Sequence, residues 1–369
     1  MCTLAQSGPA AGGDRRERGH IWVLVRLGGR VSAWALAMQW THLGHAMWLA
    51  EAAGQRLLFD PLLGATHHCG VYQTVPPRTL HVEALRPSVI LVSHRHPDHF
   101  DIASLRQLAA LYADVPVVTP DPLVQWAARE LGFRDVRSLV APQTLELPGL
   151  RMTATESLGR DEWGMLVAAD DAVVWNQVDT VLRDPDHVRR VARDALARVD
   201  AARIDLALVR WQPMHEIAAQ LGERIAFPFE TYADLLAQIV AAEAGAIVPS
   251  ACGGSHTADF RWLDHVFCPV SPRRFLSDMA RYEPDLDAFP AVLGGRYAVV
   301  GGEVEFDPRP DRTLIASAEA GDDPRVYRPL SVPPLGDPNP NRHDEAVTRP
   351  RVAGWIETEL AAALARHTT

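Results

Sequence analysis

The stretch that decides the fold is Val89-Ile-Leu-Val-Ser-His-Arg-His-Pro-Asp-His-Phe-Asp101. Its first five residues, 89–93, predict a buried strand. Four side chains of the types that bind metals follow directly, namely His94, His96, Asp98 and His99. The first two are separated by one residue and can point the same way from an extended turn, whereas the last two are adjacent and diverge. This spacing predicts a two-metal centre with one pair at each metal.

The pattern His94-x-His96-x-Asp98-His99 resembles the signature of the metallo-β-lactamase-fold superfamily. Two further segments, Trp40-Thr-His-Leu-Gly-His-Ala46 and Leu57-Leu-Phe-Asp-Pro61, are similar to the first strands of that fold in its lactonase-like and phosphodiesterase-like branches. The resemblance covers roughly residues 38–280. It implies a fold and metal binding but no particular reaction, because this superfamily hosts hydrolases, nucleases, oxidoreductases and oxygenases.

Composition sets broad limits on function. The chain has 369 residues, of which 47% are hydrophobic and 22% charged, as in ordinary soluble globular proteins. Its net charge is −10, and it has no basic run, which argues against nucleic acid as a partner. The apolar segment 21–40 is interrupted by Arg26 and Arg30, so we expect no membrane span. The four cysteines form no CxxC or Cys-x-His pair, which predicts reduced thiols in a cytoplasmic protein and no Rieske cluster.

Hydrophobic periodicity predicts alternating strands and helices around the metal motif. We expect strands within 39–60, broken near Ala53-Gly54, and at 115–119, 136–140, 150–155, 164–169, 172–176, 204–210 and 246–249, and helices at 102–112, 122–131, 185–199 and 231–244. This order predicts an α/β fold, the metallo-β-lactamase-like αββα sandwich, with a C-terminal extension.

Three regions are expected along the chain. Residues 1–37 are predicted to be a disordered extension, 38–282 the catalytic domain, and 283–369 a Pro- and Gly-rich C-terminal extension wrapped on the core. In the last region we expect a hairpin at 297–306, turned at Gly301-Gly302, and a helix at 352–367. This extension is interpreted as a lid or a dimer arm, so a homodimer is left open.

The resemblance implies three further ligands. Asp179 lies where the family has a bridging aspartate after an apolar strand. After the strand at 150–155 the hydrolases have a histidine, but this chain has Glu156, which would supply a carboxylate instead. The late ligand is assigned to His256, which follows the strand at 246–249 after Gly253-Gly254; Cys252 and His265 are rival candidates.

Other polar residues are predicted to contact a small-molecule substrate. Residues 61–88 are expected to form a loop that overhangs the metals in the resembling families. The predicted substrate-binding residues are His45, His67, His68, Tyr72 and His215.

The predicted function depends on Glu156. A carboxylate-richer site supports high-valent iron, and some members of this fold are di-iron oxygenases with a glutamate at the equivalent place. The favoured hypothesis is therefore an O₂-activating non-haem di-iron oxygenase of a small metabolite, with electrons from a separate donor or from the substrate. The alternative is a di-zinc or di-manganese hydrolase of an ester, lactone, amide or phosphodiester, in which Asp98 orients the attacking water. A degenerate member that binds without turnover is the third hypothesis.

Overall fold

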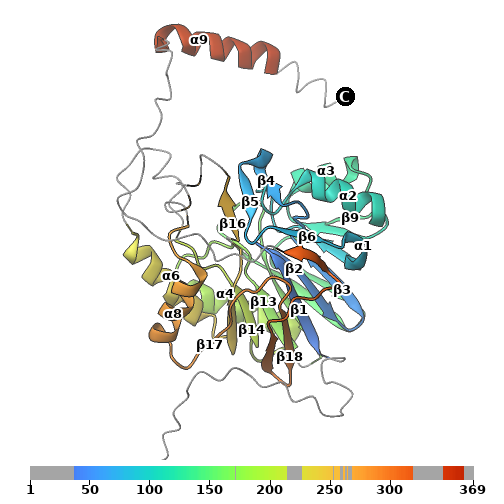
Figure 1. The fold of residues 1–369 in the computed structure, drawn as a ribbon, viewed down its shortest axis with the longest axis vertical. Coiled ribbons are helices and arrows are strands. Elements are labelled where there is room, and N and C mark those ends of the chain that lie inside the picture. Colours follow the sequence, from blue (N-terminus) through green and yellow to red (C-terminus); the bar gives the residue numbers. More distant parts are fainter. Residues whose placement is uncertain are drawn as a thin grey trace, which may run out of the picture.

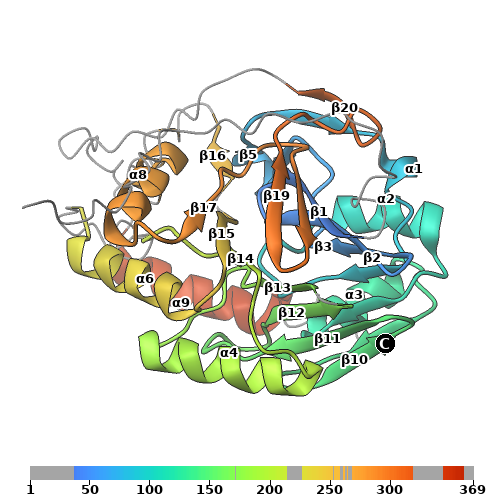
Figure 2. The ribbon, with the colours of Figure 1, turned by 90° about the horizontal axis from the view of Figure 1, so that it is seen from below.

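Two central sheets face each other in this computed structural model, and helices cover their outer faces (Figures 1 and 2). The structure describes residues 37–170, 172–213, 227–251, 253–257, 261, 264, 268–318 and 344–360. The αββα sandwich predicted from the sequence is confirmed. The extension predicted at 1–37 lies outside the described residues except for its last residue. No helix of the described ranges is both long and apolar enough to cross a membrane.

The first sheet has eight strands in the order β19-β18-β1-β2-β3-β7-β8-β9. Its strands are β1 (Met38–Gly44), β2 (Met47–Ala52), β3 (Gln55–Phe59), β7 (Val89–Leu91), β8 (Val117–Thr119), β9 (Val136–Ser138), β18 (Arg296–Val300) and β19 (Glu303–Asp307). The strands β3, β7, β8 and β9 run parallel, with Leu57 opposite Val89. The parallel pairing brings the carboxyl ends of β3 and β7 together.

The second sheet has seven strands in the order β10-β11-β12-β13-β14-β15-β17. They are β10 (Thr144–Leu147), β11 (Leu150–Thr155), β12 (Gly164–Ala169), β13 (Ala172–Asn176), β14 (Leu206–Val209), β15 (Ala246–Pro249) and β17 (Asp287–Ala288). The strands from β10 to β13 form an antiparallel meander, and β13, β14, β15 and β17 are parallel.

Large aromatic side chains fill the space between the sheets. Trp40 stacks on Phe59 with ring centroids 5.2 Å apart, and Trp48 meets Tyr297 edge-on at 5.6 Å. All four are buried, and they pack in one cluster with apolar residues of the second sheet such as Met165. Burial of this apolar area is the main stabilising contribution to the sandwich.

The helices bury their apolar faces on the outer side of each sheet. The first sheet carries α1 (Val82–Leu85), α2 (Ile102–Tyr112) and α3 (Pro122–Glu130), and the second carries α4 (Pro185–Val199), α6 (Phe229–Ala241) and α8 (Pro272–Tyr282). Aspartates cap α2, α3 and α4: Asp101, Asp121 and Asp184 each accept a hydrogen bond from a backbone N–H of the first turn.

Short strands replace the loop expected at 61–88. A three-stranded sheet in the order β16-β5-β4 joins β4 (Thr66–His67) and β5 (Tyr72–Thr74) to β16 (Gly254–His256), and β6 (Arg78–Leu80) pairs with β20 (Ile315–Ala318). The buried Arg78 binds this region to β1, because its Nε donates to Leu43 O at 2.5 Å and its Nη1 to Gly64 O at 3.0 Å.

The C-terminal region contributes strands to both main sheets. The hairpin β18–β19, turned at Gly301-Gly302 as predicted, pairs with β1, and β17 pairs with β15. The region predicted to begin at residue 283 as an extension therefore supplies three strands of the sandwich. Farther along, α9 (Glu345–Trp355) stands apart from the sheets, and its described side chains are almost all exposed (Figure 1).

Tyr297 tests whether the C-terminal hairpin is integral to the fold. Its ring packs on Trp48, and its hydroxyl accepts the Val292 N–H at 3.2 Å and donates to Pro290 O. Tyr297→Ala should lower the free energy of unfolding by about 3–5 kcal/mol through the cavity it leaves. Tyr297→Phe should cost about 1 kcal/mol, and Glu303→Ala on the exposed side of β19 still less. Urea unfolding measures all three; a loss for Tyr297→Ala as small as for Glu303→Ala would show that the hairpin is peripheral.

Candidate metal centre

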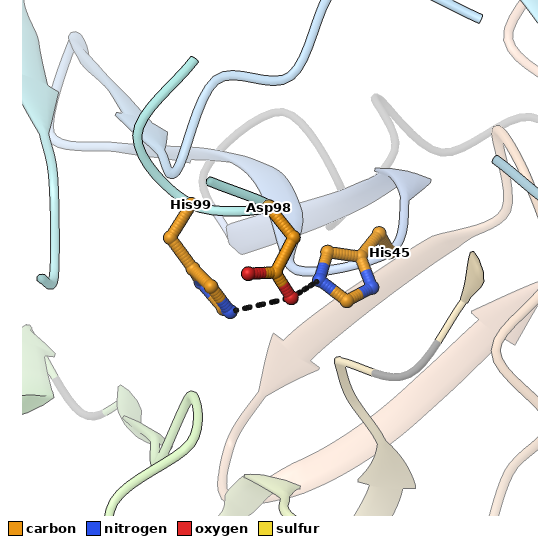
Figure 3. A group of neighbouring side chains, drawn as sticks. All are labelled: His45, Asp98 and His99. Atoms are coloured by element: carbon orange, nitrogen blue, oxygen red, sulfur yellow. Dashed lines mark hydrogen bonds and ion pairs between the residues drawn. The ribbon is translucent and has the colours of Figure 1, made fainter. Parts of the chain in front are cut away.

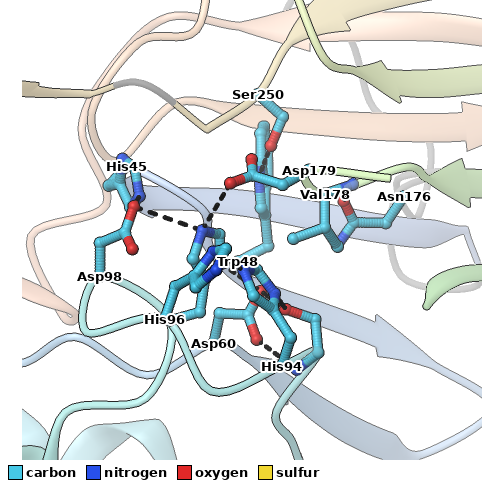
Figure 4. A network of polar contacts seen from close by, with 12 residues as sticks. His45, Trp48, Asp60, His94, His96, Asp98, Asn176, Val178, Asp179 and Ser250 are labelled. Atoms are coloured by element: carbon cyan, nitrogen blue, oxygen red, sulfur yellow. Dashed lines mark hydrogen bonds and ion pairs between the residues drawn. The ribbon is translucent and has the colours of Figure 1, made fainter. Parts of the chain in front are cut away.

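Strand ends from both sheets carry the candidate ligands to one edge of the sandwich (Figure 4). Asp60 follows β3, and its N–H donates to Leu91 O of the parallel strand β7 at 2.8 Å. The motif that begins at His94 therefore starts beside Asp60, because carboxyl ends of parallel strands share one edge. Asp179 approaches from the second sheet, shortly after β13.

A tight turn folds the motif back on itself. The carbonyl of His96 accepts hydrogen bonds from His99 N–H at 3.0 Å and Phe100 N–H at 2.8 Å. Asp101 then caps α2 by accepting the Ser104 N–H at 2.8 Å. The turn and the cap together determine where the side chain of His99 can point.

Asp60 is the buried carboxylate that holds this loop. It accepts the Ser93 N–H at 2.7 Å, the Ser93 hydroxyl at 2.9 Å and the Nδ1–H of His99 at 3.0 Å. A proton on Nδ1 leaves the lone pair of His99 on Nε2, which faces the other candidate ligands. Carboxylates commonly orient metal-binding histidines in this way.

His94 is oriented through the same carboxylate. The Ser93 hydroxyl gives its hydrogen to Asp60, so its oxygen accepts the Nδ1–H of His94 at 2.9 Å. Burial, aided by the charge of His99, lowers the pKa of His94 to about 4, so this imidazole is neutral at pH 7. Its Nε2 lone pair lies 2.8 Å from Nδ1 of His96, and the two rings therefore converge on one point.

His99 lies between carboxylates. Its Nε2 is 3.1 Å from Oδ2 of Asp179 and 3.4 Å from Oδ2 of Asp98. Burial alone would lower the pKa of His99, but Asp98, Asp179 and Asp60 outweigh it and hold the pKa well above its usual value. Burial would raise the pKa of Asp179, yet His99 brings it to about 2. This group of negative charges attracts a positive charge, whether an imidazolium or a metal ion.

His45, predicted to bind substrate, joins this cluster. Its Nε2 lies 2.9 Å from Oδ2 of Asp98 (Figure 3), and its Nδ1 accepts the Gly253 N–H at 3.0 Å. A neutral imidazole that accepts through Nδ1 carries its proton on Nε2. In this tautomer His45 donates to Asp98 and orients that carboxylate, rather than offering a lone pair to a metal.

The residues present fit a metal site. Within the part of the chain that the structure describes, His94, His99 and Asp179 place their potential ligand atoms within 4.8 Å of one another, and so do Asp98 and His99 together with His45, whose contact with Asp98 orients that carboxylate. The sequence-predicted ligands brought together are His94, Asp98, His99 and Asp179, and His96 joins them through its 2.8 Å contact with His94. Imidazole nitrogens with carboxylate oxygens suit zinc, manganese or iron.

Backbone conformation is unusual around the cluster. His45, Asp60 and Val178 have positive φ angles of 52°, 41° and 52°. This region is uncommon for residues other than glycine, and especially for a β-branched residue such as Val178, which precedes Asp179. Strain of this kind is typical of functional sites, where the surrounding contacts keep it in place.

Glu156 points away from this cluster. Its carboxylate accepts the Nε2–H of His187 at 2.5 Å and a hydrogen bond from Arg190, both on α4. The hydrogen bond from His187 lowers the pKa of Glu156 most, and Arg190 lowers it further. The arrangement is an ion-pair contact between the end of β11 and α4, and the assignment of Glu156 as a ligand stays a prediction.

His256 also lies outside the two donor groups. Its Nδ1 is 2.6 Å from Oδ1 of Asp264, and its ring is 4.1 Å from that of Tyr72. Tyr72 in turn stacks on His67, which lies 6.1 Å from the ring of His45. Of these predicted residues, His67 is the nearest to the cluster through such ring contacts, and the assignment of His256 as the late ligand stays a prediction.

The remaining predicted residues divide into two groups. His68 is exposed and contacts the edge of Tyr72. Three others lie outside the described residues, namely His215, Cys252 and His265.

Sequence reasoning missed Asp60 and Ser93 as parts of the site. The available signal was Leu57-Leu-Phe-Asp-Pro61, an apolar strand that ends in an aspartate before a proline. A carboxylate at the end of a strand that neighbours the motif strand is a candidate partner for a ligand histidine.

The sandwich and its donor cluster define a domain of the metallo-β-lactamase fold. Residues 39–198 match the family model described as "Beta-lactamase superfamily domain". Protein Rv0786c of Mycobacterium tuberculosis (strain ATCC 25618 / H37Rv) is 39% identical over 83 residues, which are 21% of this chain and 33% of that protein. The chain thus covers about a third of the length of this curated relative.

Solved structures of two proteins with different activities are similar to the chain. CmlA, a diiron beta-hydroxylase from Streptomyces venezuelae, is 19% identical, with a TM-score of 0.44 over 59% of this chain and 45% of that one. Isothiocyanate hydrolase from Delia radicum gut bacteria is 18% identical, with a TM-score of 0.49 over 70% of this chain and 98% of that one.

Asp60→Asn should weaken metal binding about 10–100-fold, the usual cost of losing such a partner. The amide would place its NH₂ group near Nδ1 of His99 and favour the tautomer with the proton on Nε2, which cannot bind a metal. Competition with a chelator, followed by metal analysis, measures the affinity. Asp114→Asn, a change of the same kind at an exposed residue, is the control, and equal affinities of the two variants would contradict the role of Asp60.

The melting temperature of the metal-free protein should depend on pH, and bound zinc should remove this dependence. The raised pKa of His99 contributes stability that is complete below about pH 6.5, its unfolded value, and is lost as the pH rises through the folded value. The melting temperature of chelator-treated protein should therefore fall above about pH 6.5. Added zinc should abolish this fall, because it supplies the positive charge without a proton. A fall that is equally steep with zinc would show that His99 is not at the metal centre.

Proposed function

We propose that the chain is a metal-dependent hydrolase that uses two divalent cations, zinc or manganese, on a small molecule with an ester, lactone, amide or phosphodiester bond. The family match and the donor cluster support the coarser conclusion that it is a metal-dependent enzyme. The observation that carries the finer proposal is the direction of Glu156. Its carboxylate is bound by α4, whereas imidazoles form the majority of the converging ligands.

We assign to Asp98 the role of orienting the attacking water and accepting its proton. Bound cations would lower the pKa of a water molecule and polarise the bond that it attacks. Oδ2 of Asp98 contacts both His45 and His99, whereas Oδ1 takes no part in these contacts (Figure 3). The side chain is 31% exposed, so a substrate can reach it. Burial would raise the pKa of Asp98, but His99 and His45 hold it well below its usual range, so the carboxylate is ionised.

The proposed roles of the other residues follow from their contacts. His94, His96 and Asp179 would hold one cation, and Asp98, His99 and Asp179 the other, with Asp179 shared. His45 positions Asp98 by donating to Oδ2, and Asp60 positions His99 and, through Ser93, His94. Each of these contacts is made before substrate arrives, which is the preorganisation that such sites need.

A di-iron oxygenase is the second candidate, and one observation favours it. Leu158 N–H donates to Val181 O at 2.9 Å, and Val181 N–H to the Ser157 hydroxyl at 3.0 Å. These bonds hold the backbone beside Glu156 next to the segment that carries Asp179. A change of side-chain direction would then be needed for Glu156 to become a ligand, and an electron donor would be needed for turnover.

Metal content and activity of three variants distinguish the two candidates. Protein loaded with zinc, manganese or ferrous iron is assayed with chromogenic ester, lactone, amide and phosphodiester substrates, and for O₂ consumption. For a hydrolase, Asp98→Asn should lower kcat about 10²–10⁴-fold, the contribution of a proton-transfer group. Glu156→Gln and the exposed control Glu146→Gln should both stay within about twofold of the parent, as surface changes do.

The opposite result would support the oxygenase. Iron-dependent O₂ consumption that Glu156→Gln abolishes and Glu146→Gln leaves intact would overturn the hydrolase proposal. Glutamine can still accept from His187 and Arg190 but is a poor metal ligand, so this comparison separates loss of a ligand from loss of the contact with α4.

A further inference from the structure

We infer that His67 recognises an uncharged hydrogen-bonding group of the substrate, such as an amide, a hydroxyl or a carbonyl, beside the candidate metal ligands. This inference rests on the proposed function, since it places the rest of the substrate on the metals. The expected substrate class carries an uncharged polar group at this position, where charged groups are disfavoured.

His67 is a buried polar residue whose side chain makes no polar contact within the described part of the chain. Its side chain is only 6% exposed, and neither ring nitrogen has a hydrogen-bond partner among the described residues. Buried nitrogens without partners are destabilising, and nearly all such groups in proteins are satisfied by some partner. A ligand that reaches this imidazole would supply the missing partner.

The ring of His67 lies close to the candidate metal ligands, because it stacks on His45, which contacts Asp98. It stacks with His45 at 6.1 Å and an interplanar angle of 29°, and with Tyr72 at 5.5 Å and 21°. His45 itself contacts Asp98 at 2.9 Å. A small molecule whose reacting bond lies at Asp98 would therefore extend past His45 to His67.

A glycine lies beside Nε2 of His67. β16 begins at Gly254, beside Gly253, whose N–H binds His45. A Cβ added at Gly254 would lie 3.7 Å from Nε2 of His67 and 3.6 Å from Gln73 O, both ordinary contacts. An alanine at this position is therefore compatible with the fold but places a methyl group against Nε2.

The charge of His67 limits what it can bind. Burial lowers its pKa to about 4, so the ring is neutral at pH 7. A neutral imidazole offers one N–H donor and one lone pair, which suit a group such as a primary amide. It offers no opposite charge to a carboxylate, a phosphate or an ammonium group, whose desolvation would be uncompensated at this position.

The probes are three hydroxamic acids that share one short alkyl linker and end in a primary amide, a carboxylate or a methyl group. The hydroxamate anchors each probe on the metals of the zinc-loaded protein, and the far end tests His67. We expect the amide-ended probe to bind about tenfold more tightly than the other two, the effect of one satisfied hydrogen bond in a buried site. Calorimetry measures the three affinities.

Variants separate hydrogen bonding from packing. His67→Phe keeps a stacking ring but no nitrogen, and Gly254→Ala keeps His67 but covers Nε2. Both should remove the preference for the amide while leaving the metal content and the affinity of the methyl-ended probe unchanged. His68→Phe, at the exposed neighbouring histidine, is the matched control and should retain the preference.

Equal affinity for all three probes in the parent protein, or a preference that survives in His67→Phe, would overturn the inference while leaving the metal centre intact. Tighter binding of the carboxylate-ended probe would also overturn it. Failure of every hydroxamate to bind would overturn the proposed metal centre, and the inference with it.

Discussion

The site depends on one interaction, the acceptance of three hydrogen bonds by the buried carboxylate of Asp60. Two of these bonds come from Ser93 at the end of the neighbouring parallel strand, and the third comes from His99. The same carboxylate thus binds two strand ends together and decides which nitrogen of His99 carries the proton. Through the Ser93 hydroxyl it also orients His94. The carboxylate of Asp60 therefore both connects the ends of β3 and β7 and orients the two candidate ligands His94 and His99.

Much of the framework could be predicted because its determinants are local. The strands at 150–155, 164–169, 172–176 and 246–249 and the helices at 102–112 and 185–199 have the predicted bounds. Apolar periodicity identified these elements, and Asp101 and Asp184 mark the starts of the two helices. The motif from His94 to His99 could be identified for the same reason, since its spacing alone brings the ligands to one strand end.

The parts that could not be predicted depend on contacts between distant residues. The tautomer of His45 is set by Gly253, 208 positions away, so the sequence could not distinguish a substrate contact from a partner of Asp98. Glu156 follows a correctly predicted strand, but its direction depends on α4. The region 61–88 was predicted as loop because strands such as β4 and β5 are too short to show alternation and pair with β16, which is remote in sequence. The proposal of a hydrolase therefore rests on the contact of Glu156 with α4, which the motif from His94 to His99 does not reveal.

The most direct test of the account is anomalous diffraction at the zinc edge from crystals of the zinc-loaded protein. The account predicts two peaks, one at His94 and His96 and one at Asp98 and His99, with Asp179 reaching both. Glu156 should keep its contacts with His187 and Arg190 of α4. A single peak, a peak at His256 and Asp264, or a metal bound by Glu156 would contradict it.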